Sequence, residues 1–229
     1  MVQRVATFRN RRYNGYVPAA GFAHDVSEAG PYQVDYGNPI VANAASILSA
    51  QSIATAGVAS GLVGTTPLLL DTLTDTFGRN LQVVASGAAT SAVTIRGRDY
   101  LGQPMVELFT LNGATPVVGN KAFKWIDSVT YAATAATTIT VGTGAKFGVP
   151  YYMTRLIGEE AAGQPTAAGT FVAGVNTDPG TSITGDPRGT YVPTTVPNGA
   201  TRIRVTYLAN NLLNASGNGG LYGIAHFYS

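Results

Sequence analysis

The stretch SAVTIRGRDYLGQPMVELFTLNG, residues 91–113, decides the fold class of this chain. In its first half, Val93 and Ile95 alternate with Thr94 and Arg96, which is the two-residue period of a β-strand with one buried face. The following LGQP combines glycine with proline and favours a turn. Two strand patterns on either side of such a turn predict a β-hairpin.

The return strand of this hairpin, MVELFTLNG, carries apolar residues on both of its faces. Glu107, Phe109 and Leu111 share one face, and Val106 and Leu108 share the other. A strand that is apolar on both faces is typical of a position between two packed layers. The sequence therefore predicts that the hairpin belongs to a layered β-structure.

The same period recurs along the rest of the chain. In TRIRVTYLA we expect Ile203, Val205 and Tyr207 to point inward, and Arg202 and Arg204 to point outward. Further strand patterns, separated by segments rich in Gly, Pro and Asn, are LQVVAS, KAFKWIDSVTYAA, TTITVGTGAKFG and LYGIAHFYS. Without a convincing long helical pattern, these strands predict an all-β fold in the form of a jelly-roll-like β-sandwich.

Two segments are less regular. Residues 40–59 contain alanines that favour helix and β-branched residues that favour strand, and the weak helix caps tip the interpretation towards strand. Residues 1–35 show neither period, and we interpret them as an extended N-terminal arm ahead of a single β-sandwich domain at residues 36–229. The arm holds too many aromatic residues for a solvated linker, so it is expected to become ordered against a partner.

The composition points to an assembly rather than to an enzyme. Charged residues make up 11% of the chain, against about 25% in an average soluble domain. A net charge of +2 does not favour a polyanion as partner, so no nucleic acid is expected. The chain has no cysteine, which excludes disulfides and thiolate metal sites. Residues 36–70 carry no charge, but Gly, Pro and Asn interrupt them repeatedly, so no membrane span is predicted.

Candidate catalytic groups are few and isolated. The two histidines, His24 and His226, lie far apart in the sequence and are expected to be structural. Adjacent strand residues point to opposite faces, so Glu159 and Glu160 cannot act as a facing acid–base pair. VGTGAKFG lacks the spacing and the following helix of a phosphate-binding loop, and Asp71 and Asp75 belong to no calcium-loop pattern. We therefore predict no enzymatic activity, no cofactor and no metal.

The strongest binding candidates lie in the arm. Its arginines and aromatics suit nucleic acid or an acidic protein surface, and the nearly neutral chain favours the protein. The candidate contacts are Arg4, Arg9, Arg11, Arg12, Tyr13, Tyr16 and Phe22. Arg188, in the turn-forming sequence GDPRG, is expected in a solvated loop and is a further candidate for contact with a partner carboxylate.

The order of several segments resembles that of structural proteins encoded beside the major capsid gene of tailed bacteriophages. The segments are FGRNLQVVASG, VTIRGRDYLGQP, ELFTLNGATPVVGNKAF, TTITVGTGAKFGVPY and GDPRGTYVPTTVPNG, and the similarity covers about residues 40–210. Such proteins are head decoration, or cement, proteins. The resemblance implies a β-sandwich or jelly-roll body, commonly a homotrimer, that clamps neighbouring major capsid protein subunits. Its expected place is the capsid outer surface of a virion made in the host bacterial cytoplasm.

Two other functions stay open at this point. The chain could be a tail or head-fibre component of a virion, because trimeric β-proteins also serve there. It could also be a carbohydrate-binding β-sandwich module, which would need exposed aromatic residues. The single tryptophan, Trp125, lies in a strand pattern and is expected in the core or at a subunit interface.

Overall fold

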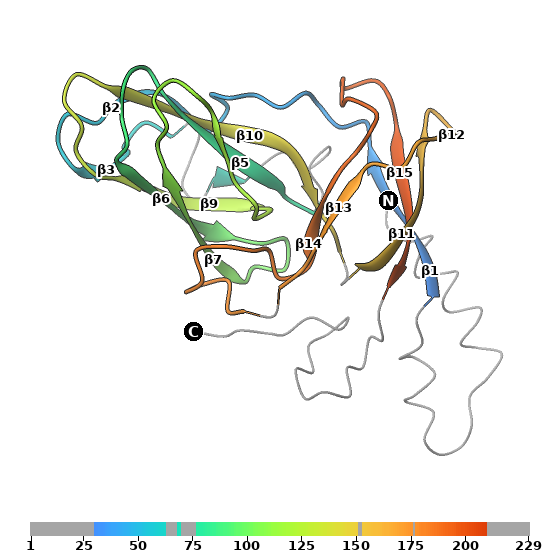
Figure 1. Ribbon diagram of the computed structural model, residues 1–229. Helices are drawn as coiled ribbons and strands as arrows, with labels where there is room; N and C mark the ends of the chain where they lie inside the picture. The colour runs from blue at the N-terminus through green and yellow to red at the C-terminus, as the bar shows by residue number, and fades with distance from the viewer. Residues whose placement is uncertain (1–29, 63–67, 70–76, 151–152, 176, 210–229) are drawn as a thin grey trace, which may run out of the picture.

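The computed structural model describes residues 30–62, 68–69, 77–150, 153–175 and 177–209. These residues form 15 β-strands and their connections, with no helix among them (Figure 1). Every strand pair is antiparallel. The predicted all-β fold is confirmed.

The strands form three sheets, of which sheet A contains both the first and the last described strand. Sheet A has the order β1-β15-β11-β12. Its members are β1 (Gly30–Gly37), β15 (Ile203–Ala209), β11 (Met153–Ala161) and β12 (Gln164–Thr166). Because β1 pairs with β15, Gly30 lies opposite Ala209, and the chain enters and leaves the described fold at neighbouring points.

Most strands of sheets B and C lie in the body drawn to the left in Figure 1, and β13 and β14 of sheet B lie near the centre, beside sheet A. Sheet B has the order β13-β14-β10-β5-β8, and β2 also pairs with β10. Its members are β2 (Leu48–Ser52), β5 (Arg79–Ala85), β8 (Val117–Val118), β10 (Thr138–Gly148), β13 (Thr170–Ala173) and β14 (Gly189–Val192). Sheet C has the order β3-β9-β6-β7, and β4 also pairs with β9. Its members are β3 (Gly57–Val58), β4 (Leu68–Leu69), β6 (Ala92–Arg98), β7 (Pro104–Thr110) and β9 (Trp125–Tyr131).

The hairpin predicted from residues 91–113 is β6 and β7. Their register runs from Ala92 opposite Thr110 to Arg98 opposite Pro104. The connecting turn contains Gly102, whose φ of 84° is a left-handed conformation that favours glycine. The prediction of a hairpin is therefore confirmed.

The expectation that both faces of β7 are covered is only partly correct. Val106 is buried, and its N–H donates to the carbonyl of Pro179, 2.8 Å away. Leu108, two residues further on the same face, is 39% exposed. Pro179, in the connection between β13 and β14, thus contacts the backbone of β7 at Val106, while Leu108 lies at the surface.

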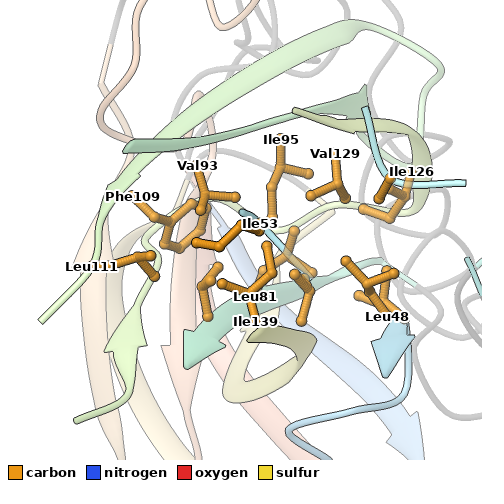
Figure 2. Packing of buried hydrophobic residues seen from close by; sticks show 14 of the residues in the cluster. Leu48, Ile53, Leu81, Val93, Ile95, Phe109, Leu111, Ile126, Val129 and Ile139 are labelled. Carbon is orange, nitrogen blue, oxygen red and sulfur yellow. The ribbon is translucent and has the colours of Figure 1, made fainter. Parts of the chain in front are cut away.

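The first hydrophobic core lies between sheets B and C. Leu81 of β5 and Ile139 of β10 meet Val93 and Ile95 of β6 and Val129 of β9, and all five are fully buried (Figure 2). Two sheets that face each other through such residues form a β-sandwich. The sandwich is thus shown, whereas the jelly-roll order of its strands stays a prediction.

The second core joins sheet A to one end of sheet B. Val34 of β1 and the predicted inward residues of β15, Ile203, Val205 and Tyr207, pack with Phe147 at the end of β10. On the other face of sheet A, the side chains of Arg202 and Arg204 form ion pairs with Asp35. The predicted inward and outward faces of β15 are confirmed. Since β10 contributes to both cores, it links the two parts of the fold.

The irregular segments can now be placed. β1 begins at Gly30, so residues 30–35 of the predicted arm belong to sheet A, and residues 1–29 lie outside the described residues. Within residues 40–59 the structure contains β2 and β3, which confirms strand rather than helix there.

Candidate functional site

Many charged residues of the described chain lie inside the protein. The buried ones are Arg79, Asp99, Glu107, Lys121, Lys124, Glu159, Asp186 and Arg188. A buried charge is costly unless it is paired or hydrogen-bonded, so the contacts of these residues must be specific. We call Asp99, Glu107, Lys121, Asp186 and Arg188 the buried charged network. It joins the β6–β7 turn, the segment between β8 and β9, and the connection between β13 and β14.

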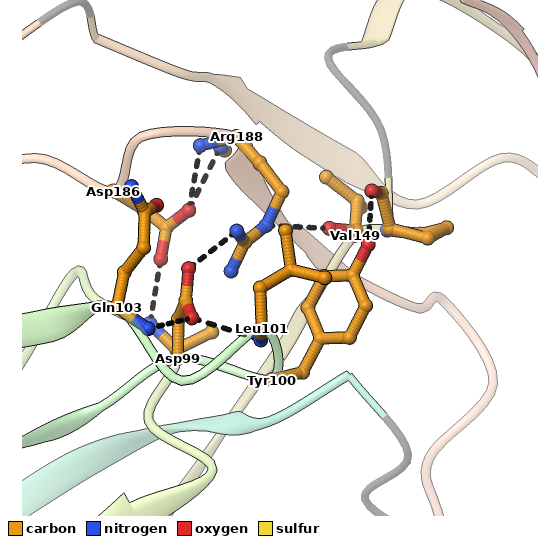
Figure 3. Close-up of polar contacts among 10 residues, drawn as sticks. Asp99, Tyr100, Leu101, Gln103, Val149, Asp186 and Arg188 are labelled. Atoms are coloured by element: carbon orange, nitrogen blue, oxygen red, sulfur yellow. Dashed lines mark hydrogen bonds and ion pairs between the residues drawn. The ribbon is translucent and has the colours of Figure 1, made fainter. Parts of the chain in front are cut away.

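Arg188 is, with Lys121, a fully buried cation of this network. Its Nη1 donates to Asp99 Oδ2 at 2.5 Å, and its Nε donates to the carbonyl of Val149 at 3.1 Å (Figure 3). Its guanidinium lies 4.5 Å from the ring centroid of Tyr100, a cation–π contact. At 1% exposure, Arg188 is neither a solvated loop residue nor available to a partner, so that interpretation was wrong. The reason is a long-range partner, Asp99, which the local sequence GDPRG does not reveal.

Asp186 fastens the same connection to the β8–β9 segment. Its Oδ1 accepts hydrogen bonds from the N–H groups of Arg188 and Gly189, at 2.9 and 3.0 Å. Its Oδ2 accepts from the N–H of Ala122 at 2.8 Å. Burial raises the pKa of Asp186, while the charge of Arg188 opposes that rise. The carboxyl group thus joins two backbone segments through hydrogen bonds.

Lys121 and Glu107 form the other end of the network. Lys121 Nζ donates to the carbonyls of Pro179 and Ser182, at 3.0 and 2.5 Å. Glu107 Oε1 accepts the N–H of Asn120 at 2.6 Å. Burial raises the pKa of Glu107 to about 7, against the opposing effects of that hydrogen bond and of the Lys121 charge. Burial also lowers the pKa of Lys121.

Glu159 is a separate buried carboxylate on sheet A. Its Oε2 accepts from the Tyr191 hydroxyl at 2.5 Å and from the N–H of Thr194 at 2.9 Å. Its neighbour Glu160 instead lies on the outer face, where Oε2 is 3.8 Å from Nη1 of Arg204. The two carboxylates therefore point to opposite faces, as predicted.

The other candidates from the sequence are placed as follows. VGTGAKFG is part of β10 and its end, not a loop before a helix. Trp125 is half-buried in β9. Residues outside the described part include the two histidines, the Asp71 and Asp75 pair, and the arm candidates Arg4, Arg9, Arg11, Arg12, Tyr13, Tyr16 and Phe22.

A metal site needs a cluster of ligating side chains among the described residues. Nowhere among them do three His, Asp or Glu side chains gather closely enough to hold a metal ion. That same part of the chain contains no helix long and apolar enough to cross a membrane. The buried charged network lies in the interior, where its polar groups mainly bond one another and the backbone. Its hydrogen bonds fix the connections that it joins.

No protein-family model, curated protein or solved structure matches this chain.

Sequence reasoning found one member of the network in the right place without recognising its role. Glu107 shares a face with Phe109 and Leu111, and this face is the buried one. A carboxylate in the inward phase of a strand is itself a signal of a buried polar contact. No comparable local signal marks Asp99 or Asp186, which the sequence presents only as turn residues.

Proposed function

We propose that this chain is a non-enzymatic structural protein of a tailed-bacteriophage virion. In this role it decorates the outer surface of the capsid and cements it by bridging major capsid protein subunits. The resemblance in segment order supports this proposal. The observation that carries it is the distribution of charged and apolar side chains.

That distribution is unusual for a protein that works alone in water. Eight charged residues are buried, while large apolar side chains are exposed on many elements. The exposed ones are Ile40, Val41, Val58, Leu101, Leu108, Val118, Ile157, Val172, Val175, Ile183 and Val196. Single exposed apolar residues are ordinary, but a surface this poor in charge suits repeated contact with neighbouring subunits.

The connection between β13 and β14 is the surface that we propose for contact with the capsid. It exposes Val175 and Ile183 and follows the exposed Val172 of β13. Its two ends are joined by a hydrogen bond from Val175 N to the carbonyl of Asp186, at 2.9 Å. Together with the two bonds from Lys121, this hydrogen bond fastens the described residues of the connection to each other and to the segment before β9. A surface held in place before binding loses less conformational freedom on association.

A binding assay with capsids that lack this protein tests the proposal. We expect the purified chain to bind such capsids, and Val175→Asp with Ile183→Asp to weaken binding at least tenfold. Val196→Asp is the matched control, because Val196 is 73% exposed but lies outside this connection. Failure of the wild-type chain to bind capsids, with binding to tails, fibres or polysaccharide instead, would overturn the proposal.

A further inference from the structure

Lys146 occupies an irregular part of β10. The pairing of β10 with β5 shifts register between Thr143 and Phe147, and Lys146 lies within that bulge. Bulges turn a side chain away from its regular strand direction. Two side chains of β5 hold the bulge in place. Arg79 Nε donates to the Gly144 carbonyl at 2.6 Å, and the Lys146 N–H donates to Asn80 Oδ1 at 2.8 Å.

The segment facing Lys146 is fixed by Asn80 and by Glu107. Asn80 Nδ2 donates to the Gly119 carbonyl at 2.9 Å, so one fully buried side chain links the backbones at Lys146 and Gly119. The next residue, Asn120, is held through its N–H by Glu107 Oε1. A Cβ at Gly119 would lie 2.5 Å from Glu107 Oε2, so glycine is what allows this close approach.

The result is a lysine held against an asparagine side chain. Lys146 Nζ donates to Asn120 Oδ1 at 2.6 Å and to the Gly119 carbonyl at 3.0 Å. The amide carbon is one C=O bond from Oδ1, so an amine at this distance lies close to the range of about 3–3.5 Å from which it can attack that carbon. Glu107 is 3% exposed, and its Oε2 accepts no hydrogen bond from any described residue.

We propose that Lys146 and Asn120 join in an intramolecular isopeptide bond, with Glu107 positioning Asn120 and serving as proton acceptor. The Lys146 ammonium first gives a proton to the Glu107 carboxylate. The neutral Nζ then attacks Cγ of Asn120, and a proton passes from Nζ to Nδ2. The Cγ–Nδ2 bond breaks, ammonia leaves and takes up the proton from Glu107, and an Nζ–Cγ amide remains. The reaction needs no oxidant, reductant or further reactant.

The electrostatics of the three residues favour these proton transfers. Burial lowers the pKa of Lys146, although the charge of Glu107 opposes this effect. The pKa of Glu107 is raised to about 7, mainly by burial. Bringing the two pKa values together lowers the cost of moving a proton from the amine to the carboxylate. A neutral amine is the form that acts as a nucleophile.

Mass spectrometry of the purified full chain tests the bond directly. We expect a mass lower than that of the sequence by about 17 Da, because one molecule of ammonia leaves when the new amide bond forms. Trypsin should not cut after Lys146, and the peptide containing Asn120 should be recovered attached to it. The branched peptide is the decisive readout, because asparagines followed by glycine can lose the same mass by ring closure.

Variants separate the role of each group. Lys146→Arg and Asn120→Ser should restore the full mass, whereas Asn112→Ser, which removes an asparagine that precedes glycine, should keep the branched peptide. Glu107→Gln should slow bond formation at least tenfold while the variant remains folded by circular dichroism. A wild-type chain cleaved normally after Lys146 would overturn the proposal. Formation of the bond at the wild-type rate in Glu107→Gln would show that Glu107 takes no part in the reaction.

Discussion

Arg188 and Asp99 are 89 residues apart in the chain, and their side chains meet in the interior with 2.5 Å between Nη1 and Oδ2. The contact fastens the start of β14 to the turn of the β6–β7 hairpin. Asp99 also holds that turn, because its Oδ1 accepts the N–H groups of Leu101 and Gln103, both at 2.8 Å. One carboxylate thus shapes a local turn and fixes a distant connection.

Replacing Asp99 with Ala should destabilise the protein strongly. The change leaves the buried Arg188 cation without its ion-pair partner, which typically costs about 3–5 kcal/mol. Denaturant unfolding followed by circular dichroism measures the change. Asp127→Ala is the matched control: Asp127 pairs with Arg98 at 3.3 Å near the surface, and its loss should cost less than about 1 kcal/mol. Equal effects of the two variants would contradict a structural role for the buried pair.

Val205→Asp should prevent folding. Val205 is fully buried in the second core, where a carboxylate would find no water, and such changes cost more than about 4 kcal/mol. Arg204→Ala, one position away on the outer face, should be tolerated, since exposed ion pairs contribute about 1 kcal/mol or less. Soluble yield and thermal unfolding compare the two variants. Similar stability of both would mean that the register of β15 is wrong.

The contrast between these two predictions also shows what the sequence can reveal. The buried and exposed faces of β6 and β15 follow from the alternation of apolar and polar residues along each strand. The partners of Arg188 and Lys121 depend on how distant connections meet, and no local pattern encodes that. For Leu108 the alternation correctly gives the face of the strand, but it does not show whether another segment covers that face.

The stability of the protein should fall as the pH rises from about 4.5 to about 7. In this window the folded state keeps a proton on Glu107, whose ordinary pKa of 4.5 is raised to about 7, while the unfolded state has lost it. The charge of Lys121 limits the shift, and that of Asp186 adds to it. Above the window, Glu107 should destabilise the fold by about 3 kcal/mol relative to a group that does not titrate.

The comparison with Glu107→Gln isolates this effect from other titrating groups. Both chains are best studied with Asn120→Ser, so that no isopeptide bond complicates the unfolding. The glutamine variant should gain stability over its parent between about pH 4 and about pH 8, which lie about one-half to one unit below and above the window. A stability difference that does not change with pH would show that Glu107 is not the group responsible.

Deleting residues 1–22 should leave a folded protein that decorates capsids poorly. The described fold begins at Gly30, so the deletion removes no residue of the described sheets. The lost arginines and aromatics are the candidate contacts of the arm. Circular dichroism should be unchanged, while capsid binding should fall at least tenfold. Wild-type binding by the truncated chain would place the contact on the β13–β14 connection instead.

The isolated protein should form a homotrimer. The small number of charged groups on its surface favours association, as does the resemblance to decoration proteins. Light scattering coupled to size exclusion measures the mass of the particle in solution. A monomer that also binds capsids as a monomer would contradict this prediction.

The pairing of Gly30 with Ala209 determines how the fold would respond to mechanical tension. A pull applied through both ends of the described chain acts at the same end of the antiparallel pair β1–β15. The hydrogen bonds of this pair would then be loaded one after another, like the teeth of a zipper, rather than all at once in shear. Strand β1 would peel away at low force, and only then would the tension pass through residues 38–47 to β2 and the sandwich of sheets B and C.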